Sequence, residues 1–124
     1  MLDIYKNKKV FITGHSGFKG SWLSMWLHSL GAEVTGYSLA PEKLSHFNLL
    51  NLPIKSYFND INDEKALLKA MEESHPDIVF HLAAQPLVRD SYDDPVGTYN
   101  TNVLGSLKVY MAALKVGVPS LVSI

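Results

Sequence analysis

Short apolar runs alternate along the chain with longer segments in which apolar residues recur at helical spacing. The short runs are predicted to form strands, and they occupy Lys9–Thr13, Glu33–Ser38, Lys55–Phe58, Asp77–Leu82 and Leu121–Ile124. The run at 77–82 is apolar at consecutive positions, as in a strand that is buried on both faces of a sheet. This pattern predicts parallel strands.

Helices are predicted in the segments between these strands. Trp22, Trp26 and Leu30 lie four residues apart, so Ser21–Leu30 is predicted to be an amphipathic helix. A short helix is expected within residues 40–54, in a long connection that contains two prolines.

The second half of the chain contains two more predicted helices. Asn62 and Asp63 are suited to cap the first, and Asp94 with Pro95 begins the second, which runs to Gly117. Apolar residues follow helical spacing in this last helix at Val96, Tyr99, Val103, Leu107, Tyr110, Met111 and Leu114. For Val103, Leu107 and Met111 we expect core packing at most of the three positions, with a dimer interface as the alternative.

Strands and helices therefore alternate along residues 1–124, which we predict to form one domain. Parallel strands joined by right-handed helical crossovers give an α/β, Rossmann-type doubly wound sheet. The expected strand order is 3-2-1-4-5.

Composition and charge narrow the possible function classes. Hydrophobic residues make up 47% of the chain and charged residues 19%, which is typical of a globular domain. The net charge of −1 gives no electrostatic basis for binding nucleic acid or an anionic membrane. The chain has no cysteine for a disulfide or a thiolate metal site, and no apolar run near the roughly 20 residues of a membrane span. A cytoplasmic protein without a metal site is expected.

A glycine-rich loop, Gly14–Gly20, lies between the first strand and the first helix and has the spacing Gly-x-x-Gly-x-x-Gly. The first glycine allows a sharp turn, the second lets the backbone approach a pyrophosphate, and the third lets the helix pack close to the sheet. The loop therefore predicts dinucleotide binding, with a merely tight turn as the alternative. A nucleoside-triphosphate loop is excluded because Lys19 precedes the last glycine.

The end of the second strand lacks the usual ribose-binding acid. It reads Ser38-Leu39-Ala40, and Glu33 lies at the opposite end of that strand. No arginine is present there to hold a 2′-phosphate. These residues leave the choice between NAD and NADP open.

Two further segments follow strands at the same expected sheet edge. Asp60-Ile61 is placed to meet an adenine ring, although an acid near a helix start is an equally good interpretation. The small residues after His81 would let the backbone lie against ribose and nicotinamide. His81 itself is expected to be a buried, hydrogen-bonded histidine rather than a catalyst or a metal ligand.

Two of these segments resemble the extended short-chain dehydrogenase/reductase family. They are Thr13–Leu23 (TGHSGFKGSWL) and His81–Arg89 (HLAAQPLVR). Within the family they are most similar to sugar-nucleotide 4,6-dehydratases whose substrate is CDP-glucose, and 18–22 and 85–89 are the more discriminating parts. Later residues also match, at Pro95, Thr98, Tyr99, Thr101, Asn102, Val103 and Gly105, so the resemblance spans essentially the whole chain.

The resemblance implies NAD as cofactor and assigns residues to it by position. Those implied are Gly14, Ser16, Gly17, Phe18 and Lys19 at the pyrophosphate, Asp60 and Ile61 at the adenine, and Leu82, Ala83, Ala84 and Gln85 at the ribose and nicotinamide. Asn102 matches the helix asparagine with which such enzymes fix strand geometry near the active site. Arg89 is a candidate substrate-side residue, with a surface ion pair as the alternative.

The chemistry that the resemblance implies is a dehydration with an internal redox cycle. A hydride leaves C4 of the glucose, the resulting ketone acidifies C5–H, water leaves across C5 and C6, and the hydride returns to C6. The family uses a Ser/Thr, a Tyr-x-x-x-Lys pair and an acid/base pair just beyond the fifth strand, and this chain contains none of them in that place. Ser123 is expected to face the sheet interior, so no catalytic residue is assigned.

The fifth strand uses up the chain, so we expect a partial domain whose remaining strands and substrate domain lie outside residues 1–124. Such a piece is expected to be inactive alone and to belong to a homo-oligomeric enzyme. Two alternatives stay open: a related GDP-mannose dehydratase or UDP-sugar epimerase, and a non-catalytic dinucleotide-binding module.

Overall fold

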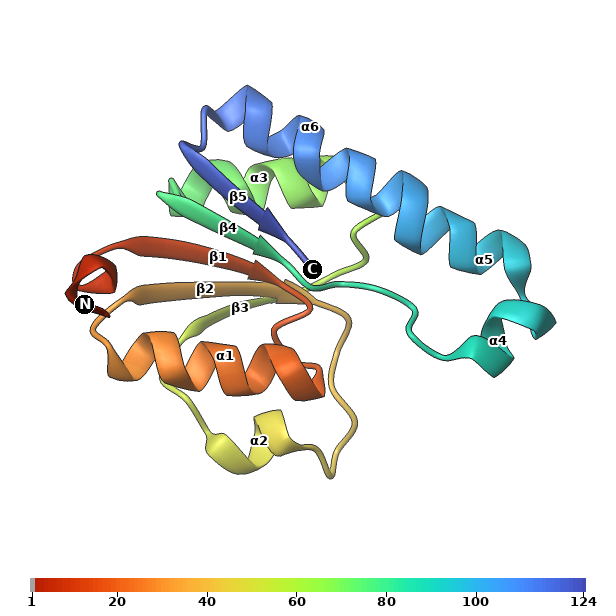
Figure 1. Cartoon of the computed structure of the whole chain (residues 1–124), viewed down its shortest axis with the longest axis horizontal. Coiled ribbons are helices and arrows are strands. Elements are labelled where there is room, and N and C mark those ends of the chain that lie inside the picture. The colour runs from red at the N-terminus through yellow and green to blue at the C-terminus, as the bar shows by residue number, and fades with distance from the viewer. Residues whose placement is uncertain (1) are drawn as a thin grey trace.

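The computed structural model describes residues 2–124, which form a parallel sheet with helices on both faces (Figure 1). The strands are β1 Lys9–Thr13, β2 Glu33–Ser38, β3 Lys55–Phe58, β4 Ile78–His81 and β5 Ser120–Ser123. The helices are η1 Leu2–Tyr5 (3-10), α1 Phe18–Ser29, α2 His46–Leu50, α3 Glu64–Ser74, α4 Val88–Asp93, α5 Pro95–Tyr99, η2 Asn100–Gly105 (π) and α6 Ser106–Val116.

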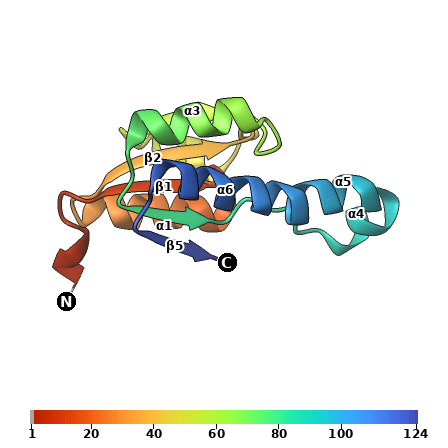
Figure 2. The same ribbon diagram turned by 90° about the horizontal axis from the view of Figure 1, so that it is seen from above.

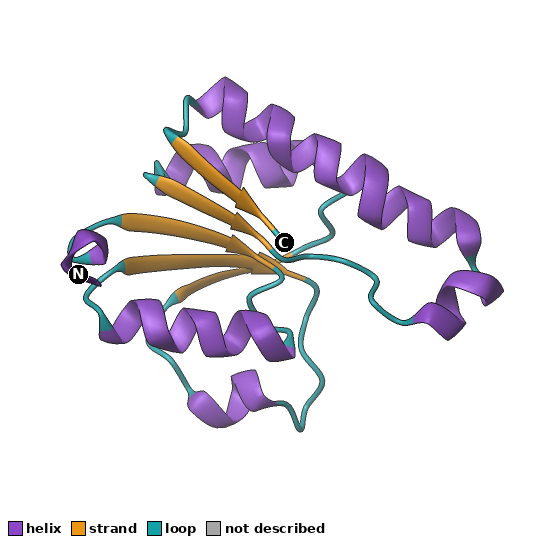
Figure 3. Cartoon of the chain, viewed as in Figure 1, coloured by secondary structure: helices purple, strands orange, loops and turns teal. Residues whose placement is uncertain are grey.

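The five strands are all parallel and lie in the order β3-β2-β1-β4-β5, which confirms the predicted fold. The central strand β1 pairs with β2 and β4, so Ile12 lies between Gly36 and Phe80. Helices α1 and α2 cover one face of the sheet, and α3 and α6 cover the other (Figures 1 and 3). All strands point to one edge, where the connecting loops gather.

Each face of the sheet has its own hydrophobic core. Phe11 and Val79 point to the side of α3 and α6, where they pack with Leu67, Met71 and Val109. On the other face, Val10, Ile12 and Val34 pack with Leu27 of α1. The predicted strands are confirmed, with β4 ending at His81 and β5 shifted by one residue to Ser120–Ser123.

The expectation that β4 is buried on both faces is only partly correct. Val79 and His81 are buried, whereas Ile78 and Phe80 on the opposite face are half-buried. Helix α1 lies under the β1–β2–β3 side of the sheet and leaves this part of the face open (Figure 1).

Helix α1 packs on the sheet through small residues rather than through its tryptophans. Gly20, Ser21 and Ser24 are buried with Leu27, while Trp22 and Trp26 are 48% and 53% exposed. The predicted apolar face of this helix is therefore wrong at the two tryptophans, whereas Leu27 beside them is buried as expected. A helix that sits close to a parallel sheet needs small side chains at the contact, and the large aromatic rings are displaced to the outer surface.

The long helix after residue 95 contains a π-helical segment that the sequence pattern did not predict. Elements α5, η2 and α6 form one continuous helix that projects beyond the sheet, with α4 folded against its start (Figure 2). The expected core packing of its apolar stripe is wrong, because Val103 and Leu107 are each 53% exposed and Met111 is 47% exposed. Smaller residues, Gly105, Val109, Ala112 and Ala113, are buried instead.

Two negative findings concern the described residues 2–124. No helix in that range has the length and apolar character needed to cross a membrane. The same range holds no group of three or more His, Asp or Glu side chains placed to bind a metal ion.

Candidate dinucleotide-binding site

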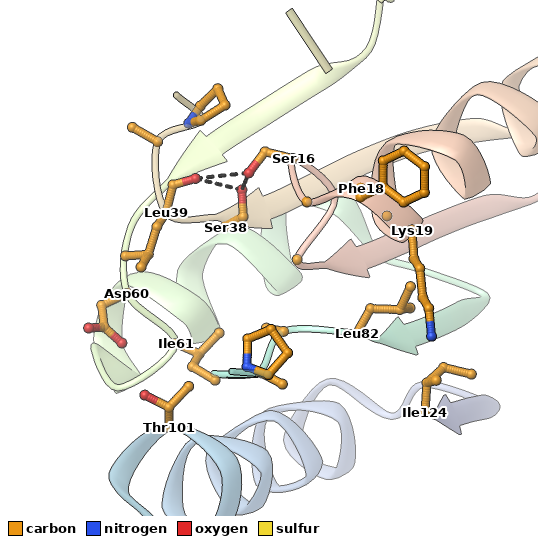
Figure 4. A pocket seen from close by; sticks show the side chains of 18 of the residues that line it. Ser16, Phe18, Lys19, Ser38, Leu39, Asp60, Ile61, Leu82, Thr101 and Ile124 are labelled. Carbon is orange, nitrogen blue, oxygen red and sulfur yellow. Dashed lines mark hydrogen bonds between the residues drawn. The ribbon is translucent and has the colours of Figure 1, made fainter. Parts of the chain in front are cut away.

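A pocket of about 660 Å³ opens at the sheet edge where the parallel strands end (Figure 4). It is bounded by the glycine loop and by the segments after β2, β3 and β4. The lining residues are Gly14, Ser16, Gly17, Phe18, Lys19, Gly20, Ser38, Leu39, Ala40, Pro41, Asn59, Asp60, Ile61, Leu82, Ala83, Ala84, Pro86, Thr101 and Ile124. Ligands of open parallel sheets bind at this edge.

The three glycines of the loop occupy their positions for different structural reasons. Gly14 has φ +75°, and a Cβ there would lie 2.7 Å from the backbone nitrogen of Ala83. A Cβ on Gly20 would lie 2.0 Å from the Gly14 carbonyl oxygen, so Gly20 brings α1 against the loop. A Cβ on Gly17 would have the Gly14 oxygen at 3.4 Å as its nearest neighbour. Gly14 and Gly20 serve the fold, whereas Gly17 leaves open space beside the pocket.

The N-terminus of α1 presents free backbone donors to the pocket. The helix begins at Phe18, and its first internal bond runs from the Ser21 N–H to the Gly17 carbonyl at 2.8 Å. No side chain within residues 2–124 caps this end. The N–H groups of the first turn and the helix dipole together favour an anion at this point, which fits the pyrophosphate of a dinucleotide.

Two serines join the glycine loop to the end of β2. The hydroxyls of Ser16 and Ser38 lie 2.7 Å apart, and that of Ser16 donates to the Leu39 carbonyl at 3.0 Å (Figure 4). The only charged side chains among the lining residues are Lys19 and Asp60. The side of the pocket formed by Ser38 to Pro41 therefore offers hydroxyl and backbone groups where many dinucleotide sites offer an acid.

The segment after β3 places Asp60 and Ile61 at the pocket. The Asp60 carboxylate accepts a hydrogen bond from the Asn62 N–H at 2.8 Å. The backbone carbonyl of Asp60 accepts a second one from the Tyr37 hydroxyl at 2.9 Å. Burial, with Asp63 and Asp60 nearby, raises the pKa of Tyr37 to about 12. Asp60 thus shapes the turn before α3, and it also lines the pocket, so both interpretations of this acid are compatible with the structure.

The predicted residues after β4 divide into two groups. Leu82, Ala83 and Ala84 line the pocket, whereas Gln85 lies beside it, bonded to Asn102. The Asn102 side-chain oxygen accepts from the Gln85 N–H at 2.8 Å, and its amide donates to the Gln85 carbonyl at 3.0 Å. Asn102 lies in η2 and does not line the pocket; it holds the loop that does.

Two histidines near the pocket are buried, His15 within the glycine loop and His81 at the end of β4. His81 is buried and hydrogen-bonded, as predicted, and burial lowers its pKa. His15 was not singled out from the sequence, although it is fully buried and its Nε2 lies 2.9 Å from the Ser56 hydroxyl. Burial lowers the pKa of His15 to about 4. A glycine inside a strand, Gly36 in β2, is the sequence signal that could have indicated the buried His15 ring. A Cβ at Gly36 would lie 2.0 Å from His15 Cδ2, so only glycine leaves room for that ring.

Two further residues considered from the sequence, Ser123 and Arg89, are not among the lining residues of the pocket. Ser123 is exposed rather than turned into the sheet interior, and its hydroxyl lies 2.7 Å from that of Tyr110. Arg89 is exposed on α4 and takes part in none of the ion pairs among residues 2–124. Lys19 and Asp60 are the ionisable side chains among the lining residues, so the pocket has few groups that could transfer a proton.

Comparison with known proteins identifies the family of this chain. Residues 10–124 match the profile of the NAD dependent epimerase/dehydratase family. The chain is 48% identical over 122 residues to CDP-glucose 4,6-dehydratase of Salmonella typhimurium, covering 94% of this chain and 34% of that protein. It spans about a third of the length of the curated relatives it matches.

Two solved structures have the same arrangement of elements. The epimerase Mth375 of Methanothermobacter thermautotrophicus superposes with a TM-score of 0.86 at 35% identity, over 98% of this chain and 36% of that one. The Thermus thermophilus UDP-glucose 4-epimerase, solved as a complex with NAD, gives 0.82 at 30% identity, over 90% and 35%. The chain belongs to the NAD dependent epimerase/dehydratase family.

Proposed function

We propose that the complete protein carrying this chain is a sugar-nucleotide 4,6-dehydratase that converts CDP-glucose to CDP-4-keto-6-deoxyglucose with bound NAD. The single observation that carries this choice is the 48% identity to a CDP-glucose 4,6-dehydratase, against 30% to the UDP-glucose epimerase. The pocket supports the cofactor, because uncapped N–H groups of α1 face a space bounded by four strand ends.

Residues 1–124 are proposed to form the NAD-binding part of that enzyme. The pyrophosphate is bound by the loop through Gly14, Ser16, Gly17, Phe18 and Lys19, and the adenine lies at Asp60 and Ile61. Leu82, Ala83 and Ala84 lie along the ribose and nicotinamide, and Gln85 and Asn102 hold that segment in place. Ser38 and Leu39 at the end of β2 leave no cation for a 2′-phosphate, which supports NAD over NADP.

Bound NAD would accept the hydride from C4 of the sugar and return it to C6. The chain's own contribution is to bind, to orient and to exclude water along the Leu82–Ala84 wall. The groups that remove the C4 hydroxyl proton and the C5 proton, and that protonate the leaving C6 hydroxyl, are proposed to lie in a part of the enzyme outside residues 1–124. Chain 1–124 alone is therefore expected to show no turnover of CDP-glucose.

The substrate assay is a comparison of CDP-, GDP-, UDP- and dTDP-glucose with the complete enzyme, together with GDP-mannose. We expect a 4-keto-6-deoxy product from CDP-glucose and at most traces from the others. Turnover of GDP-mannose, or epimerisation of a UDP-sugar without loss of water, would assign the protein to the two related activities instead. Binding of NAD without turnover of any sugar nucleotide would indicate a non-catalytic module.

A homo-oligomer in the cytoplasm is also proposed. The stripe formed by Val103, Leu107 and Met111 is about half exposed along a helix that projects beyond the sheet. Exposed apolar stripes of this kind are typical of interfaces between subunits. NAD and nucleotide sugars are charged metabolites that do not cross membranes unaided, which supports a cytoplasmic location.

A further inference from the structure

A continuous set of hydrogen bonds joins the ends of β1 and β4 to the π-helical segment behind the pocket. Thr13 and His81 are paired in register as the last residues of β1 and β4, and Thr13 Oγ1 lies 2.6 Å from His81 Nδ1. On the other side of the ring, His81 Nε2 lies 2.8 Å from the hydroxyl of Ser106, the first residue of α6. His81 is 3% exposed, so water does not compete for either ring nitrogen.

The bond at Ser106 determines which ring nitrogen of His81 carries the proton. The Ser106 hydroxyl donates to the carbonyl oxygen of Asn102 at 2.7 Å. Its single hydrogen is therefore used, and its oxygen can only accept from the ring. His81 Nε2 must be the N–H donor in this contact.

The bonds at Thr13 fit the same tautomer. Thr13 Oγ1 accepts hydrogen bonds from the N–H groups of Leu82 and Ala83, each at 3.2 Å, and the Leu82 N–H is shared with the Thr13 carbonyl oxygen at 3.1 Å. With the ring proton on Nε2, His81 Nδ1 is an acceptor, so the Thr13 hydroxyl donates to it while its oxygen accepts from the two amides. The ring is thus neutral, with the proton on Nε2, and every donor and acceptor in the set has a partner.

This hydrogen-bond set holds the pocket wall at two points. Thr13 fixes the beginning of the wall through the amides of Leu82 and Ala83, and Asn102 fixes its end through both backbone groups of Gln85. The wall lies directly against the glycine loop, since a Cβ on Gly14 would meet Ala83 N at 2.7 Å. A displacement of either end would move Ala83 into or away from the pocket.

We propose that His81 is a positioning residue for the dinucleotide pocket: as the Nε2–H tautomer it couples Thr13 to Ser106 and so fixes segment 82–85 against the glycine loop. The inference rests on the proposed NAD binding. In this proposal the π-helical segment η2 places two residues that hold segment 82–85: Asn102, which lies in η2, and Ser106, which follows it directly. The titratable side chain that faces the His81 ring from α6 is Tyr110, whose ring centroid lies 5.9 Å away, edge to face.

The first test is the protonation state of His81, measured by ¹⁵N NMR of the ring nitrogens in the chain without NAD. We expect a protonated Nε2 and an unprotonated Nδ1 at neutral pH. A ring protonated at Nδ1, or a charged ring, would overturn the proposal, because Thr13 could then not hold both the ring and the two amides.

The second test compares His81→Phe and Ser106→Ala with Leu67→Ala as a matched control. Leu67 is fully buried in the core between the sheet and α3 and makes none of the hydrogen bonds of this set, so its loss destabilises the fold while leaving every bond of the set in place. Calorimetry with NAD should show roughly tenfold weaker binding for His81→Phe, which corresponds to about 1.4 kcal/mol. Binding to the control should change less than about twofold. If NAD affinity fell equally in all three variants, His81 would support only the fold and the proposed positioning role would be wrong.

Hydrogen exchange separates this inference from the proposed function. The amides of Leu82 and Ala83 should exchange at least about tenfold faster in Ser106→Ala, a change small enough to leave the fold intact, and not in Leu67→Ala once global unfolding is subtracted. If the complete wild-type protein binds no NAD, the proposed function fails, and the exchange rates and the NMR tautomer still decide the role of His81. If the Leu82 and Ala83 amides exchanged at the wild-type rate in Ser106→Ala, the proposed positioning role of His81 would be overturned.

Discussion

Replacing Gly17 by valine should weaken cofactor binding without removing the fold. Gly17 has φ −71° and ψ 173°, an extended conformation that valine adopts readily, and a new Cβ would have only the Gly14 oxygen nearby, at 3.4 Å. Because Gly17 is the N-cap of α1 and valine is a poorer N-cap than glycine, we expect the free energy of unfolding to fall by at most about 1 kcal/mol. The added methyl groups would occupy the space before the first N–H groups of α1, where the pyrophosphate is expected to lie.

The expected loss of affinity follows from the donors that the valine would block. A hydrogen bond from a backbone N–H to a charged acceptor contributes about 1.5–3 kcal/mol. Loss of one such bond should weaken NAD binding by roughly 10- to 150-fold, measured by calorimetry on the complete protein.

Gly20→Ala is the matched control, because its Cβ would lie 2.0 Å from the backbone oxygen of Gly14. That contact can be relieved only by moving α1 away from the loop, so this variant should lose stability as well as affinity. If Gly17→Val bound NAD as tightly as the wild type, the assignment of this loop to the pyrophosphate would be refuted.

Three further predictions concern the fold and the assembly. Gly36→Ala should cost about 1–3 kcal/mol in urea unfolding, since the Cβ would lie 2.0 Å from His15 Cδ2, and a second change, His15→Ala, should recover part of that loss; a neutral Gly36→Ala would contradict the packing. Because the pKa of His15 falls from 6.5 unfolded to about 4 folded, the unfolded chain binds the extra proton and stability should drop by up to roughly 3 kcal/mol as the pH falls from 7 to 4. His15→Gln should flatten this profile, and an equally steep profile would assign the effect to other groups. Leu107→Glu should dissociate the complete protein in sedimentation experiments, whereas Glu72→Lys, on the exposed surface of α3, should not; an unchanged oligomer in Leu107→Glu would place the interface elsewhere.

The strand pattern could be predicted from the sequence because it depends on local chemistry. The ranges Lys9–Thr13, Glu33–Ser38 and Lys55–Phe58 agree with the structure residue for residue. Each is a run of β-forming residues bounded by glycine, proline or a polar turn, and parallel pairing with helical crossovers leaves few ways to order such strands. The site residues at the strand ends followed from this topology, because the chain carries them to one edge of the sheet.

The buried faces of α1 and α6 could not be predicted, because hydrophobicity alone does not say which side of a helix meets a sheet. Helix α1 buries Ser21 and Ser24 and exposes Trp22, and α6 buries Ala112 and Ala113 while Leu107 stays half exposed. Close approach of a helix to a parallel sheet selects for small side chains at the contact. Apolar periodicity finds the helix correctly and assigns its buried face wrongly wherever size, rather than polarity, decides the packing.

The contacts of His81 that hold segment 82–85 could not be predicted from hydrophobic periodicity. A buried polar side chain is costly unless it is fully hydrogen-bonded, so the sequence can afford His81 only with partners on both ring nitrogens. Thr13 and Ser106 are those partners, and they stand 68 and 25 residues away in the chain. No local pattern could have joined them. Their contact exists because β1 and β4 are neighbours and because the π-helical turn brings Ser106 over the end of β4, so the wall depends on a long-range agreement among three elements.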